Sequence, residues 1–135
     1  MRSLVYLPVL LLLLTGCGTM QTYSVIIRNV SKSYITDAHI VYGFIRTAGG
    51  VVPPGDSKGH GDISCPVPEK ALAEWRTEDG VMHRKEVLVR RAIPKNMKPW
   101  IIEFQIGENE DVVVVPKADP SPGFNAYDLP DLPQK

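Results

Sequence analysis

Apolar and polar residues alternate in several short stretches of this chain, at the two-residue spacing of β-strands. The clearest example is the first, in which Tyr23, Val25 and Ile27 are separated by single residues and the β-branched content is high. Successive side chains of a strand point to opposite faces, so each stretch can bury one face. The pattern predicts seven strands, over residues 23–28, 38–44, 58–64, 71–76, 81–90, 100–106 and 112–115.

The alternation also predicts which side chains form the core. In the second stretch Ala38, Ile40, Tyr42 and Phe44 share the buried face, and His39 is expected to be more exposed. In the fifth, Val81 begins a buried face that Val87 and Val89 continue. The unbroken valines at 112–115 suggest burial on both faces. Trp75 and Trp100 are the expected core anchors, because truncating a buried tryptophan costs several kcal/mol.

Turn signals separate these stretches. Pro53-Pro54-Gly55-Asp56 combines prolines that preset φ with a glycine that accepts positive φ, and Thr77-Glu78-Asp79-Gly80 is typical of a hairpin loop. No segment has convincing helical periodicity, and residues 68–73 contribute at most one helical turn. Short strands at such regular spacing favour an antiparallel β-sandwich of immunoglobulin-like architecture. A small open barrel is the alternative.

The chain opens with a hydrophobic leader. Arg2 precedes an apolar run over residues 4–14, which is shorter than the roughly 20 residues that a membrane-spanning helix needs. It ends in Leu14-Thr15-Gly16-Cys17, which resembles the lipobox of bacterial lipoproteins. The resemblance implies removal of residues 1–16, cleavage between Gly16 and Cys17, and a diacylglyceryl group on the Cys17 thiol. An ordinary signal peptide is the alternative.

The same resemblance gives a location. Gly18 stands where an aspartate is associated with retention in the inner membrane, so the anchor is expected in the outer membrane, facing the periplasm. Residues 17–22 then form a short tether to a domain over residues 23–116. Residues 117–135, rich in proline, are expected to be extended or disordered: either a frayed terminus or a segment that docks on a partner.

Net charge and cysteine content limit the kinds of molecule that the chain is expected to bind. Removing residues 1–16 leaves fourteen basic and fifteen acidic side chains, which gives no electrostatic case for nucleic acid. With Cys17 committed to lipid, Cys65 has no partner within the chain. It is expected to be a buried small hydrophobe at a strand end, with a bond to another chain as the alternative.

The sequence offers little catalytic chemistry. His39, His60 and His83 lack the short spacings of zinc sites. Ser57 stands in Gly55-Asp56-Ser57-Lys58-Gly59, but in a predicted turn, where a hydroxyl normally bonds to the backbone, and not in the strand-to-helix elbow of a nucleophilic serine. Glu108, Glu110 and Asp111 lack the spacing of a calcium loop, so they are expected to stay solvated or, less favourably, to form a weak divalent ion site. We therefore expect no enzyme, no metal, and no cofactor besides the lipid.

A basic pair, Arg84-Lys85, lies in the fifth predicted strand, and a second, Arg90-Arg91, lies at its end. Lysine and arginine at a sheet edge commonly prevent aggregation between strands. The alternative is a patch that faces anionic lipid headgroups or an acidic protein.

The remaining resemblance covers residues 23–115. Residues 25–31, Pro54-Gly55-Asp56-Ser57 and residues 75–80 make the chain similar to small bacterial lipoproteins that carry one immunoglobulin-like domain. Some of these are periplasmic immunity proteins against lipase effectors of type VI secretion systems. The resemblance implies a non-enzymatic protein-binding module, and within this group of proteins it implies an inhibitor of a phospholipase. The alternatives are an accessory subunit of an envelope complex and, if a large apolar cavity exists, a lipid carrier.

Loops would supply the partner contacts, because the loops of a sandwich gather at its two ends. The expected contact elements are residues 49–61 and 94–99. The candidate residues within them are Gly55, Asp56, His60, Lys95 and Lys98.

Overall fold

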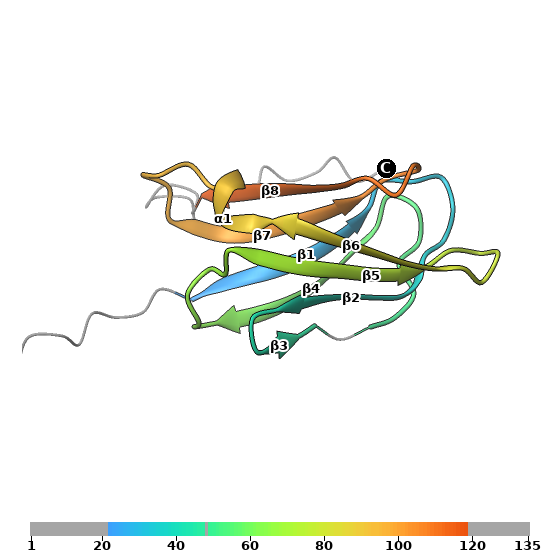
Figure 1. Ribbon diagram of the computed structural model, residues 1–135, viewed down its shortest axis with the longest axis horizontal. Coiled ribbons are helices and arrows are strands. Elements are labelled where there is room, and N and C mark those ends of the chain that lie inside the picture. The colour runs from blue at the N-terminus through green and yellow to red at the C-terminus, as the bar shows by residue number, and fades with distance from the viewer. Residues whose placement is uncertain (1–21, 48, 119–135) are drawn as a thin grey trace, which may run out of the picture.

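The computed structural model describes residues 22–47 and 49–118, which form two four-stranded sheets packed face to face (Figure 1). The predicted all-β sandwich is confirmed. One sheet has the order β4 (Ser57–Ile63), β1 (Tyr23–Asn29), β7 (Pro99–Ile106), β8 (Val112–Ala118), and the other β3 (Ile45–Arg46), β2 (Thr36–Tyr42), β5 (Lys70–Arg76), β6 (Met82–Leu88). A four-residue helix, α1 (Val89–Ala92), follows β6. The expected leader, the lipidated Cys17 and residues 119–135 of the tail lie outside the described residues.

Every neighbouring pair of strands is antiparallel except β1 and β7, which run parallel with Ser24 opposite Ile101. Consecutive strands β1 and β2 lie in different sheets, whereas the first two strands of an immunoglobulin domain share one sheet. The chain thus shares the sandwich architecture and has its own connectivity. Since β1 and β7 are parallel, both begin at one end of the molecule, which we call the N-terminal end. β8 finishes there, because Ala118 pairs with Pro99.

The opposite end, which we call the distal end, carries the loops over residues 30–34, 77–81 and 107–111 (right side of Figure 1). β1 connects the two ends. At about 3.3 Å per residue, its seven residues separate them by about 20 Å. Among the described residues, no helix is long and apolar enough to cross a membrane.

The core forms where alternate positions of the two sheets meet. In β1 and β5, every second side chain from Tyr23 to Asn29 and from Ala71 to Trp75 is buried. Within this core the Tyr42 ring meets the rings of Tyr23 and Phe104 edge to face, at centroid distances of 6.1 and 6.3 Å. This edge-to-face geometry is the one that aromatic quadrupoles favour.

Several predicted burials are wrong, and two of the errors fall at the end of a strand. Trp100 is 44 % exposed, because it lies at the start of β7, beyond the core layers that Ile102, Phe104 and Ile106 fill. Phe44 is fully exposed, because β2 ends at Tyr42 and the chain turns through Gly43, whose φ is 59°. Trp75, by contrast, is a core anchor as expected.

The fifth predicted stretch also differs from the structure. Val81 is exposed because it belongs to the hairpin loop, and β6 begins only at Met82. Val89 is buried, but from α1, so Arg90 and Arg91 lie on a helix and only Arg84 and Lys85 lie on the edge strand β6. No helical turn forms over residues 68–73, because β5 begins within them at Lys70.

The last strand, β8, lies at the edge of its sheet, and two further corrections concern it. Val113 is exposed because β8 has a neighbour on one side only and its outer face meets solvent. β8 extends to Ala118, three residues beyond its predicted end, because Lys117 and Ala118 still pair with β7. His39 is also buried, contrary to expectation: Glu74 on the neighbouring strand β5 lies against its ring at 3.4 Å, and Arg84 on β6 pairs in turn with Glu74.

Candidate functional site

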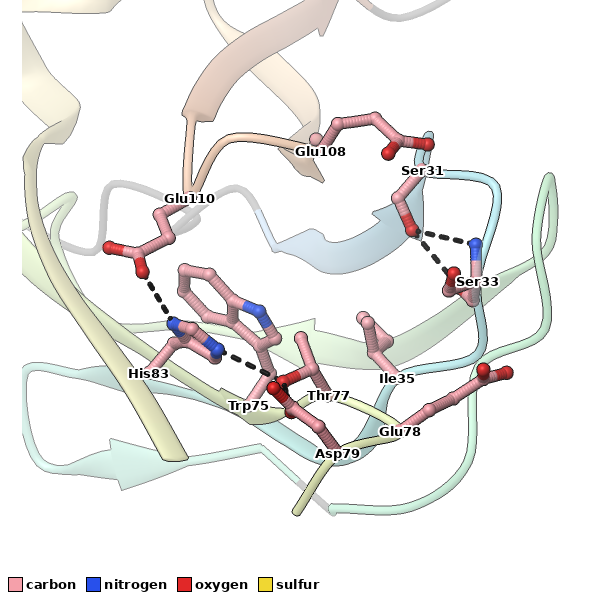
Figure 2. A pocket seen from close by; sticks show the side chains of 11 residues that line it. Ser31, Ser33, Ile35, Trp75, Thr77, Glu78, Asp79, His83, Glu108 and Glu110 are labelled. Atoms are coloured by element: carbon pink, nitrogen blue, oxygen red, sulfur yellow. Dashed lines mark hydrogen bonds and ion pairs between the residues drawn. The ribbon is translucent and has the colours of Figure 1, made fainter. Parts of the chain in front are cut away.

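A pocket of about 220 Å³ opens between the three distal loops. Figure 2 shows the indole of Trp75 and the imidazole of His83 side by side within it, with carboxylates around the rim. Residues from both sheets build it: Ser31, Ser33, Ile35, Trp75, Thr77, Glu78, Asp79, His83, Gly107, Glu108 and Glu110.

One buried side chain, Asn29, holds the loop over residues 30–34. Its amide nitrogen donates hydrogen bonds to the carbonyls of Ser33 (2.7 Å) and Val52 (2.9 Å). Its oxygen accepts from the backbone nitrogen (3.0 Å) and the hydroxyl (2.6 Å) of Ser31. Only an amide side chain can donate and accept in this way, so the bonding of Asn29 fixes this wall of the pocket.

His83 forms the inner wall. Its ring stacks on Trp75 with a centroid distance of 5.4 Å and an interplanar angle of 17°. Its Nδ1 lies 2.9 Å from Oε1 of Glu110, and its Nε2 lies 3.0 Å from the hydroxyl oxygen of Thr77. Glu110 reaches this position from a left-handed backbone conformation, with φ of 60°, which is uncommon for a residue with a β-carbon.

The set of Glu110, His83 and Thr77 has the outline of a catalytic triad, but its hydrogen bonds run the other way. A triad hydroxyl must donate its proton to the imidazole. Here the Thr77 hydroxyl donates to the carboxylate of Asp79, so it can only accept from Nε2 of His83. Nδ1 of the same ring faces a second carboxylate, that of Glu110. In this geometry His83 bonds to the carboxylate of Glu110, and the Thr77 hydroxyl does not donate to the ring, so His83 does not activate Thr77 as a nucleophile.

The rim is acidic, and its carboxylates hold the loops. Glu108 accepts a hydrogen bond from the backbone nitrogen of Lys32 (2.6 Å), and Glu78 accepts one from that of Tyr34 (3.2 Å). Hydrogen bonds from the Thr77 hydroxyl and then from the Val81 backbone lower the pKa of Asp79. Each of these acids therefore has a structural role, and together they give the pocket a negative rim.

The structure gives no metal site in the part of the chain it describes: no group of three or more histidine, cysteine or acidic side chains is close enough to hold an ion. The expected cluster of Glu108, Glu110 and Asp111 is divided, because Glu108 bonds to the loop at Lys32 and Glu110 to His83.

The residues expected to contact a partner do not gather in one place. Gly55 and Asp56 lie at the distal end, where their backbones bond to that of Asn29, but outside the pocket. His60 is exposed on the edge strand β4. Lys95 and Lys98 lie in the loop between α1 and β7, at the N-terminal end. These five assignments remain predictions.

Sequence reasoning missed the pocket, although one signal was available. The predicted hairpin loop at residues 77–80 brings Trp75 close to His83, although the observed loop also includes Val81, and this extra residue is what sets Trp75 directly opposite His83. Glu110 could not be found in this way, because packing of the two sheets brings it to His83.

The other candidate side chains have structural surroundings. Nδ1 of His39 lies 2.8 Å from the carbonyl of Asp37, and its Nε2 lies 3.4 Å from Glu74. Cys65 is a free thiol and only partly buried, packed against the core just after β4. Its carbonyl accepts a hydrogen bond from the Tyr23 hydroxyl at 2.9 Å.

Comparison with known proteins supports the fold. No family model matches the chain, and no curated protein matches it. A solved structure described as "NMR structure of the protein from Eubacterium rectale" is similar, with a TM-score of 0.52 and 14 % sequence identity. The match covers 79 % of this chain and 98 % of that one. At this identity the likeness concerns the fold alone: the two chains share a β-sandwich.

Proposed function

We propose that this chain is a lipid-anchored protein of the bacterial envelope that acts as a non-enzymatic protein-binding module through its distal pocket. One observation carries the proposal: the acidic pocket and the start of β1 lie at opposite ends of the sandwich, about 20 Å apart along β1. An anchor at Cys17 would join the domain at the end where β1 begins. The pocket would then point away from the membrane, toward a partner.

The chemistry of the pocket favours a partner with basic side chains. Glu78, Asp79, Glu108 and Glu110 surround a small hollow, and complementary charge steers encounter and selects partners. The direction of the Thr77 hydrogen bond supports binding rather than catalysis. Following the resemblance to immunity lipoproteins, we infer that the partner is a secreted phospholipase that the module neutralises.

A separate experiment tests the lipid anchor on Cys17. Mass spectrometry of the membrane-extracted protein is expected to find Cys17 acylated and residues 1–16 absent. The Cys17→Ala variant is expected to leave the membrane fraction, because the chain then lacks its lipid. An unacylated mature chain that stays with the membrane would refute the anchor.

We expect a neighbouring gene to encode a secreted phospholipase, and calorimetry against its product tests the partner, with the double variant Glu78→Gln/Glu108→Gln. Glutamine keeps an oxygen that can accept from the backbone nitrogens of Lys32 and Tyr34, so the loops are retained and only charge is lost. We expect at least a tenfold loss of affinity, equal to about 1.4 kcal/mol.

The matched control is Glu69→Gln/Glu86→Gln, which removes two exposed carboxylates outside the pocket. Equal affinity of both double variants would contradict the distal site. Truncation after Ala118 separates the accessory-subunit alternative, because a tail-docked subunit would detach, whereas pocket binding would survive. The cut is placed there because Lys117 bonds to Glu103 and belongs to β8.

A further inference from the structure

The N-terminal end of the sandwich is basic. Residues 90–98, between the start of α1 and the start of β7, contain four basic residues and no acidic one. Arg90 pairs with Glu69 at 3.1 Å. The described residues give no carboxylate partner to Arg91, Lys95 or Lys98. At least three positive charges, on α1 and the loop after it, therefore face solvent.

Apolar side chains accompany these charges. An open groove of about 640 Å³ runs beside α1, lined among others by Ile93, Lys95 and Met97. Trp100 follows the lining residue Pro99 in the chain and is 44 % exposed. Tryptophan is enriched at membrane–water interfaces, where its apolar ring and its polar N–H are both accommodated. A basic surface with a half-exposed indole is the combination that an anionic bilayer surface favours.

The chain itself places this surface beside the proposed anchor. The parallel pairing of Ser24 with Ile101 brings Trp100 level with Tyr23, the first residue of β1. Five residues separate Cys17 from Tyr23, and their covalent geometry spans less than about 20 Å whatever their conformation. The acidic rim is carried by the distal loops, which lie at the other end of the sandwich (Figure 1), where an anionic surface would repel it least.

We propose that a basic face, consisting of Arg90, Arg91, Lys95, Lys98 and Trp100, binds the anionic phospholipid headgroups of the bilayer. Binding of headgroups does not depend on the lipid on Cys17; only the identity of the membrane rests on the proposed function. Each basic residue near such a surface strengthens binding about fivefold, and salt weakens the effect over a Debye length of about 8 Å. The short tether would hold this face at a high effective concentration near the bilayer. The domain would thus stand with its pocket outward.

The test uses the mature chain, residues 18–135, produced without lipid and sedimented with vesicles. We expect it to bind vesicles of phosphatidylcholine mixed with phosphatidylglycerol, and not those of phosphatidylcholine alone. Lys95→Glu/Lys98→Glu is expected to weaken binding at least tenfold. The control Lys32→Glu/Lys85→Glu makes the same change in net charge at exposed sites outside the basic face, and should alter binding less than about twofold.

A second readout is tryptophan fluorescence. Trp75 is 2 % exposed, so a blue shift on adding anionic vesicles would report Trp100, and Trp100→Phe should abolish it. Equal binding to both vesicle types, no binding to either, or equal loss in the two charge variants would overturn the proposal. None of these results depends on acylation of Cys17, which mass spectrometry tests separately.

Discussion

The imidazole of His83 lies flat against the indole of Trp75, with ring centroids 5.4 Å apart, and joins the rim of the distal pocket to the core. Trp75 is buried, whereas His83 reaches the surface and bonds to Thr77 and Glu110. Through this stacked pair, the position of the rim depends on the packing of the two sheets.

His83→Ala is therefore expected to lower the free energy of unfolding by about 1–3 kcal/mol. The change removes the stack and two hydrogen bonds, one of them to a carboxylate. Urea unfolding followed by circular dichroism measures it. His60→Ala on the exposed edge strand is the control and should change stability by less than about 0.5 kcal/mol. Similar values for the two variants would show that the stack contributes nothing.

The left-handed conformation of Glu110 leads to a second prediction. Glu110→Gly relieves a backbone cost of about 1 kcal/mol but loses the contact with His83, so the effects nearly cancel in the wild-type chain. In the His83→Ala background no contact remains to be lost, and the same change should stabilise by about 1 kcal/mol. A double-mutant cycle measures this difference. Identical effects in both backgrounds would refute the coupling.

Asn29 should be the most sensitive polar position near the pocket. Asn29→Asp cannot donate to the carbonyls of Ser33 and Val52 and brings a charge into a fully buried position, at a cost of about 3 kcal/mol or more. Thermal unfolding is the measurement. Asn96→Asp, in an exposed loop, provides the matched control and should be nearly neutral. A comparable loss at Asn96 would point to net charge as the cause.

Asn29, Trp75 and Trp100 show which features of the fold the sequence pattern predicts and which it does not. Alternation predicted the strands that contain them, because one buried face leaves a period of two in the sequence. It did not reveal where each strand leaves the core, so Trp100 was expected to be buried. Nor could it reveal the parallel pairing of β1 with β7, since residues about 75 positions apart make that contact. The pocket depends on such long-range contacts, and only its Trp75–His83 pair is local.

Two buried tyrosines differ in their bonding, and this gives a fourth prediction. The Tyr23 hydroxyl donates to the carbonyl of Cys65, whereas the Tyr42 hydroxyl has no hydrogen-bond partner among the described residues. Tyr23→Phe should lower stability by about 1 kcal/mol, and Tyr42→Phe should leave it unchanged or raise it. Each variant serves as the control for the other in thermal unfolding.

Unfolding at alkaline pH tests the burial of Tyr42 separately. The pKa of Tyr42 is raised from its usual value of 10 to about 12, mainly because the phenol is buried. Because the fold favours the protonated phenol, this contribution to stability is complete below pH 10 and is lost as the pH rises to about 12. Tyr42→Phe should remove part of that loss. An unchanged pH profile would contradict burial of the phenol.

Glu103 is a buried acid on the outer face of its sheet, and it gives the last prediction. It is 1 % exposed, with Lys117 at 2.9 Å, Gln105 at 2.7 Å and Arg28 at 3.3 Å. Burial alone, the largest effect, raises its pKa. The hydrogen bonds from Gln105, Lys117 and Arg28 together outweigh burial and leave the pKa below its usual range.

A lowered pKa in the fold means that the ionised carboxylate stabilises the protein. This stability is complete above the unfolded pKa of about 4.3 and is lost as the pH falls through the folded value. Glu103→Gln should therefore cost about 1–3 kcal/mol at pH 7, and the difference from wild type should shrink in urea unfolding below about pH 4. The control is Glu86→Gln, which breaks an exposed pair with Lys70 and should cost less than about 1 kcal/mol. A cost at Glu103 that is independent of pH would show that shape, not charge, matters there.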